Sequence, residues 1–176
     1  MAQSVDMLKE SFGYVVAKRV ENDLDAFATA RVLAKTIDNQ GPFDVVLCGR
    51  QASDWDNAQV PLGIAEVLDL PAITIARKVE VVGNKVRVER VLSNGYEVME
   101  AALPALVTVS NELGEPRYPT LRGIMAASKK QPTVWSVQDL GMESSQLRNT
   151  LDLKDLFIPE KPTQCDFIQG DDEADS

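Results

Sequence analysis

The chain lacks histidine altogether and has only two cysteines, Cys48 and Cys165. Imidazole is the usual proton carrier near neutral pH and a frequent zinc ligand, so Ser-His-Asp triads, imidazole acid–base catalysis and Cys/His zinc sites are excluded within this chain. Two cysteines so far apart are read more simply as reduced thiols of a cytosol-like compartment than as a disulfide. Histidine-dependent enzyme classes are therefore ruled out.

Basic clusters and long apolar runs are also lacking. The 176 residues carry 18 Lys and Arg against 27 Asp and Glu, for a net charge of -9. Nucleic-acid and anionic-membrane surfaces need clustered cations, and a membrane span needs about 20 apolar residues. The opening "MAQSVDMLKE" has the features of neither a signal nor a transit peptide. We therefore predict a cytoplasmic, bacterial-type protein without nucleic-acid partners or membrane insertion.

What is present, in the first half, is alternation of strand-like and helix-like segments. Strands are expected at 14–18, 43–49 and 72–76, the second buried on both faces like a central parallel strand. Helical apolar stripes lie between them, the first ending at Gly41. Their members are Phe27, Ala30, Ala34 and Ile37 in one, and Val60, Ile64, Val67 and Leu68 in the other. This order predicts an α/β fold, a mainly parallel sheet with helices on both faces.

The second half has a different period. Residues 78–102 alternate apolar and polar and are broken by "GN" and "NG", which predicts an antiparallel hairpin excursion. A return strand is expected at 105–110, and a proline-punctuated segment then leads into a short helix. Residues 141–176 are expected to form an extended C-terminal arm with an acidic tail.

The loop "GRQASDWDNAQV" lies where a ligand of a parallel sheet would bind, at the carboxyl end of a strand and before a helix. Arg50 and the side-chain amides of the loop suit phosphate or ribose oxygens. A polar surface turn with a helix cap explains the same composition, and the residues alone leave both readings open. Asp54 and Asp56 have no evident third ligand beside them, so no metal site is predicted.

In four segments the sequence resembles the beta subunit of electron-transfer flavoproteins, in register from about residue 24 to 140. The segments are "TARVLAK", "CGRQASDWDNAQV", "VERVLSNGYEVMEAALPALVTVS" and "EPRYPTLRGIMAASKK". The resemblance implies a Rossmann-like nucleotide-binding domain over residues 1–140. It also implies a heterodimer with an alpha subunit that carries the redox FAD. The family's N-terminal strand has no match upstream of Tyr14, and its final helix has none after the acidic tail. A chain truncated at both ends is therefore expected.

By the same resemblance, the loop wraps the phosphate of AMP, or of a second FAD. The nucleotide-binding residues implied are Gly49, Arg50, Gln51, Ala52, Ser53, Asp54, Trp55, Asp56, Asn57, Ala58, Gln59 and Val60. No catalytic residue is implied, because the beta subunit itself is expected to carry out no covalent chemistry.

The resemblance also assigns a partner-recognition segment at 116–130, which would dock acyl-CoA or related dehydrogenases with Leu121 as an apolar anchor. From the residues alone, the same side chains would instead pack on the core. The partner-binding residues implied are Arg117, Tyr118, Pro119, Thr120, Leu121, Ile124 and Met125, with Arg122, Lys129 and Lys130 at the rim.

The function expected is thus that of a carrier subunit, through which the alpha-subunit FAD shuttles electrons from dehydrogenases to an acceptor. Two alternatives remain. One is an electron-bifurcating form that binds a second FAD here and oxidises NADH. The other is a non-redox module that binds an adenine nucleotide without a flavoprotein partner.

Overall fold

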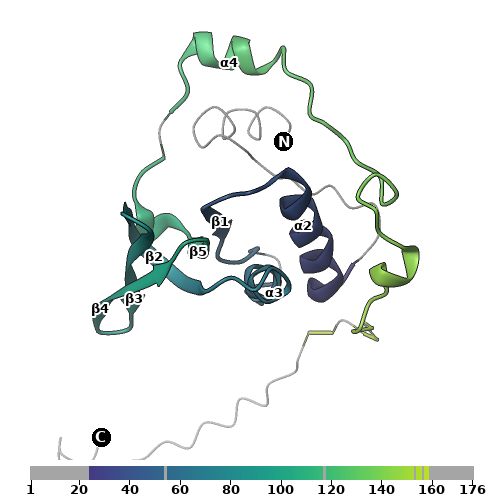
Figure 1. The fold of residues 1–176 in the computed structure, drawn as a ribbon, viewed down its shortest axis with the longest axis horizontal. Coiled ribbons are helices and arrows are strands. Elements are labelled where there is room, and N and C mark those ends of the chain that lie inside the picture. Colours follow the sequence, from purple (N-terminus) through teal and green to yellow (C-terminus); the bar gives the residue numbers. More distant parts are fainter. Residues whose placement is uncertain (1–23, 54, 117, 153, 156, 159–176) are drawn as a thin grey trace, which may run out of the picture.

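The computed structural model describes residues 24–158, except 54, 117, 153 and 156 (Figure 1). The strand predicted at 14–18, Cys165 and the acidic tail lie outside the described residues. Within them, no helix is both long enough and apolar enough to cross a membrane.

One mixed sheet forms the centre of the described fold. Its strands stand in the order β1-β5-β2-β3-β4, with β1 parallel to β5, β5 parallel to β2, and the last two pairs antiparallel. The α/β class and the hairpin excursion are thereby confirmed. The first turn is at the predicted "GN", and the second is at Ser93–Asn94, one residue before the predicted "NG". The strands are β1 (Val45–Gly49), β2 (Ala72–Val82), β3 (Lys85–Leu92), β4 (Gly95–Ala102) and β5 (Ala105–Val109).

The helices predicted between the strands are present. The first begins after its N-cap Asp25 and ends before Gly41, as expected. The elements are α2 (Ala26–Gln40), α3 (Gln59–Val67) and α4 (Leu121–Ala127), with the short 3₁₀ turns η1 (Asn111–Leu113) and η2 (Ser144–Leu147). In Figure 1, α4 stands apart from the sheet while α2 and α3 lie close together.

One face of the sheet packs on α2 and α3. Leu106 of β5 points to this side and is fully buried with Ala30, Ala34, Ile64 and Ala65. The burial predicted for the apolar stripes is therefore confirmed at their centres. It is wrong at two positions, because Phe27 is 47% exposed and Val67 is 53% exposed. The other ends of the two stripes, Ile37 and Leu68, still pack against this cluster.

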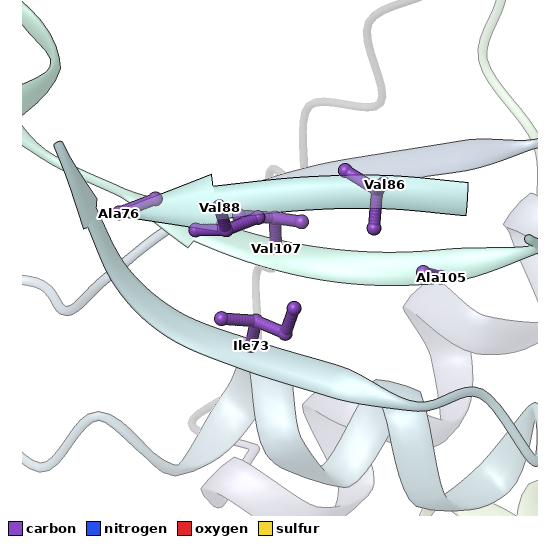
Figure 2. Packing of buried hydrophobic residues seen from close by; sticks show 6 residues of the cluster. All are labelled: Ile73, Ala76, Val86, Val88, Ala105 and Val107. Atoms are coloured by element: carbon purple, nitrogen blue, oxygen red, sulfur yellow. The ribbon is translucent and has the colours of Figure 1, made fainter. Parts of the chain in front are cut away.

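The other face is covered by strands. Figure 2 shows Val86 and Val88 of β3 lying close to Ile73, Val107 and Ala105, in one cluster with Ala76. Helices were expected on both faces, but among the described residues α2 and α3 share the Leu106 face. The long strand β2 continues into the hairpin, which brings the apolar side of β3 onto the second face.

The first strand is less buried than its sequence predicted. Leu47 in the middle of β1 is 43% exposed. In the part of the chain that the structure describes, β1 is an edge strand paired only with β5, so one flank of its apolar run is uncovered.

Candidate functional site

The polar loop begins where two parallel strands end together. Gly49 of β1 lies opposite Val109 of β5 in the parallel register. The backbone N–H of Arg50 then donates to the carbonyl of Val109 at 3.0 Å. Loop 49–60 and the turn after β5 therefore share one edge of the sheet. The carboxyl ends of parallel strands are the usual place for ligands in open α/β sheets.

The loop turns tightly without using glycine. Asp56 and Ala58 have φ values of 53° and 51°, in the left-handed region that non-glycine residues rarely adopt. Two contacts hold this path: the N–H of Asp56 donates to the carbonyl of Ala52 at 3.0 Å, and the Gln51 amide donates to the Asp56 carboxylate. The strained backbone is thus tied within the loop itself, a feature that occurs often at ligand sites.

The loop delivers the chain into the N-terminus of α3. The residue at the cap position is Ala58, whose side chain offers no acceptor to the first N–H groups of the helix. Pro61 is buried in the first turn of α3 and has no N–H of its own. The donors of Gln59 and Val60 and the positive end of the helix dipole therefore face the loop, an arrangement that suits an anion.

A side chain that the sequence reasoning missed lies beside Arg50. The Arg50 guanidinium approaches the Glu112 carboxylate of η1 at 3.8 Å. Hydrogen bonds from the Ser110 hydroxyl and from its own backbone N–H, with the charge of Arg50, hold the pKa of Glu112 below its usual range. Glu112 follows the carboxyl end of the strand next to β1. That position was the available signal, since neighbouring parallel strands end at one edge.

The remaining loop residues are mostly at the surface. Ala58 and Val60 are half-buried, and Asp54 lies outside the described residues. Trp55 is 60% exposed, so its side chain does little to cover the core. In the described part of the chain, no group of three acidic or cysteine side chains is placed to hold a metal ion. The exposed set is Gly49, Gln51, Ala52, Ser53, Trp55, Asp56, Asn57 and Gln59.

The second predicted site, around α4, exposes its apolar side chains. Tyr118 is 87% exposed, Leu121 75% and Met125 58%. The hydroxyl of Thr120 caps the helix by accepting from the N–H of Gly123 at 3.2 Å. These side chains are therefore not core residues in this structure, and partner binding by them stays a prediction. Pro119, Arg122 and Lys129 are exposed too, Ile124 is partly so, and Arg117 lies outside the described residues.

Comparison with known proteins places these features in one family. A family model described as the electron transfer flavoprotein domain matches residues 11–140. The electron transfer flavoprotein subunit beta of Thermoanaerobacterium thermosaccharolyticum is 44% identical over 135 residues, which cover 76% of this chain and 52% of that protein. That of Megasphaera elsdenii is 39% identical, over 73% of this chain and 52% of its own.

A third relative has a different name. Subunit CarD of the caffeyl-CoA reductase-Etf complex of Acetobacterium woodii is 37% identical over 146 residues, 80% of this chain and 56% of that protein. The chain thus spans 52% to 56%, about half, of the length of these three relatives.

Proposed function

Because this chain belongs to the electron transfer flavoprotein family, among its beta subunits, we propose that it works as the beta side of a heterodimer. Its partner is an alpha subunit whose FAD takes electrons from acyl-CoA or related dehydrogenases and passes them to an acceptor. The flavin supplies the redox chemistry. The residues of this chain bind and orient and form no covalent intermediate.

In this proposal, loop 49–60 holds the phosphate of AMP or FAD. The observation that carries it is the meeting, at one edge of the sheet, of Arg50, the loop amides and the bare N-terminus of α3. Arg50 supplies a charge-assisted contact and the backbone N–H groups supply neutral ones. Asp56 and Glu112 are already engaged by Gln51 and Arg50, so the residues present fit a phosphate that displaces Glu112 from Arg50.

Partner docking is assigned to α4 and the residues before it. The exposed side chains of Tyr118, Leu121 and Met125 form an apolar surface on an element that stands clear of the sheet (Figure 1). Cations Arg122 and Lys129 flank it, and such a surround is typical of anchor sites in transient complexes. A dehydrogenase that presents an apolar pocket with acidic edges would be the matching partner.

A second candidate function is the form that binds FAD in the loop and oxidises NADH. The observation that favours it is the similarity to CarD, whose name places that protein in a reductase–Etf complex. The two forms differ in what fills the loop and in whether NADH is a substrate.

The test is co-expression of this chain with an alpha subunit encoded in the same genome. The expected result is a one-to-one complex that contains FAD and whose flavin is reduced by an acyl-CoA dehydrogenase with its substrate. A second FAD and NADH oxidation would establish the second candidate instead. A chain that binds adenine nucleotide but never associates with the alpha subunit would overturn both and leave the non-redox module.

A further inference from the structure

A hollow in the described part of the molecule lies away from loop 49–60. It is a groove of about 860 Å³ between α2, the end of α3 and residues 141–150. The C-terminal segment runs alongside α2 at the right of Figure 1. The groove is lined by Val67 and Leu68, at the far end of α3 from the loop, so it is separate from the proposed nucleotide site.

Positive charge gathers in this groove although the whole chain has a net charge of -9. Arg31 and Lys35 stand one turn apart on α2, and Arg148 lines the opposite wall. Asp38 is the one carboxylate among the described lining residues, and it pairs with Lys35 at 3.1 Å. Within the described residues, neither arginine has a carboxylate within the 4.0 Å of an ion pair.

Arg31 makes one hydrogen bond across the groove and has one buried donor without an acceptor. One of its terminal nitrogens, Nη2, donates to the carbonyl of Arg148 at 2.9 Å, which ties the two walls together. Its Nε is buried and has no hydrogen-bond partner in the described structure. A buried donor without an acceptor is costly. Because a guanidinium carries five N–H donors, Arg31 still has Nη donors to offer an oxyanion after its bond to Arg148.

The rest of the lining is apolar or neutral. Ala34, Val67 and Leu68 form a floor from α2 and α3, and Met142 and Ser145 come from the C-terminal segment. The volume is in the range of small-molecule sites, which pair an apolar lining with a few polar groups. We propose that this groove binds a small organic oxyanion, a phosphate or carboxylate, between Arg31 and Arg148, with the apolar body of the ligand on Val67 and Leu68.

The test is an NMR titration of the full chain with phenyl phosphate, followed at the side-chain Nε–H signal of Arg31 and the backbone amides of 145–150. The expected result is a saturable shift of both. Inorganic phosphate should bind more weakly because it has no apolar body, and benzyl alcohol should leave the Arg31 signal unmoved because it has no charge.

Variants separate this site from general anion binding. Arg148→Gln should weaken phenyl phosphate binding at the Arg31 signal by about tenfold, since it removes one charge-assisted contact. Arg87→Gln, an exposed arginine on β3 outside the groove, should leave it unchanged. The proposal would be overturned if the Arg31 signal showed no saturable shift or responded equally to benzyl alcohol. It would also be overturned if both variants lost the same affinity for phenyl phosphate.

Discussion

At the scale of single residues, Asp25 joins distant parts of the chain. Its carboxylate caps α2 by accepting from the N–H of Ala28 at 2.7 Å, and also accepts from the Thr150 hydroxyl at 2.8 Å and the Leu151 N–H at 3.0 Å. In return, its own N–H donates to the Asn149 side chain at 2.8 Å. One side chain therefore fixes both the start of α2 and the C-terminal segment beside it.

The pKa of Asp25 follows from these contacts. Burial alone would raise it, but the hydrogen bonds from Ala28, Thr150 and Leu151 outweigh burial and hold the pKa well below its usual range. A carboxylate with a depressed pKa adds stability at pH above its unfolded value of about 3.9, and this contribution is lost as the pH falls from there towards the folded pKa.

We predict that Asp25→Ala lowers the free energy of unfolding by about 1 kcal/mol at pH 7, as losing an N-cap typically does. The difference from the wild type should shrink as the pH drops below about 4. Urea unfolding at pH 7 and pH 3 measures both. Asp25→Asn, which keeps a capping oxygen, should cost less than Asp25→Ala. A difference of the same size at both pH values would contradict this account.

At the scale of elements, α2 and α3 touch through residues that lack bulk. A Cβ placed on Gly63 of α3 would lie 2.7 Å from the Cβ of Ala30 on α2, closer than real Cβ atoms approach. Neither atom belongs to a flexible side chain, so only movement of a whole helix relieves the contact. Gly63 is therefore required for close approach.

Gly63→Ala is expected to destabilise the fold despite the better helix propensity of alanine. Overpacking costs about 1–3 kcal/mol, while the helix gains about 1 kcal/mol, so the clash wins by about 1 kcal/mol. Chemical denaturation of the variant measures the net effect. Adding Ala30→Gly should restore room, so the double variant should lose less than the sum of the two single changes. Strict additivity would show that the two residues do not limit helix approach.

In helix α4, removing a large side chain is expected to leave the stability of the fold almost unchanged. Leu121 is 75% exposed, so Leu121→Ala should change the free energy of unfolding by no more than about 0.5 kcal/mol. If Leu121 anchors a partner, the same change should weaken dehydrogenase binding by about 2 kcal/mol or more.

Two assays decide between anchor and core: a urea melt, and electron transfer from a cognate dehydrogenase in the reconstituted heterodimer. Leu92→Ala on the hairpin, where the leucine is 38% exposed, is the control and should leave transfer unchanged. A large loss of stability, with transfer reduced only in proportion to folded protein, would make Leu121 a core residue.

These elements also show what a sequence can predict. The helices and hairpin were predictable because their signals are local: the spacing of Ala30 and Ala34, and the turn dipeptides before β3 and β4. The pairing of Arg50 with Glu112, and of Asp25 with Thr150, depends on contacts between residues far apart in the chain. No local pattern encodes them. The exposure of Phe27 was mispredicted for the same reason, because the burial of a helix position depends on which distant elements pack against it.

At the scale of the whole molecule, the three surfaces with a proposed function lie on different parts of the fold. The proposed nucleotide loop lies at the carboxyl ends of β1 and β5, the proposed docking surface is α4, and the basic groove lies between α2 and the C-terminal segment. That segment is also tied to α2 at its beginning, where the Asn39 amide donates to the Leu140 carbonyl at 3.4 Å. Residues before and after position 140 thus pack on α2. The predicted division of the chain into 1–140 and 141–176 stays a proposal.

The central claim, that loop 49–60 holds a nucleotide phosphate, has one most direct measurement. It is calorimetric titration of AMP and FAD into the wild type, Arg50→Gln and Glu112→Gln. Arg50→Gln should weaken binding by about tenfold or more, because it removes a charge-assisted contact. Glu112→Gln should strengthen binding, because the phosphate no longer competes with a carboxylate for Arg50. The account predicts that Glu112→Gln binds most tightly, the wild type less tightly and Arg50→Gln most weakly. Equal affinity in all three, or no binding by any of them, would contradict it.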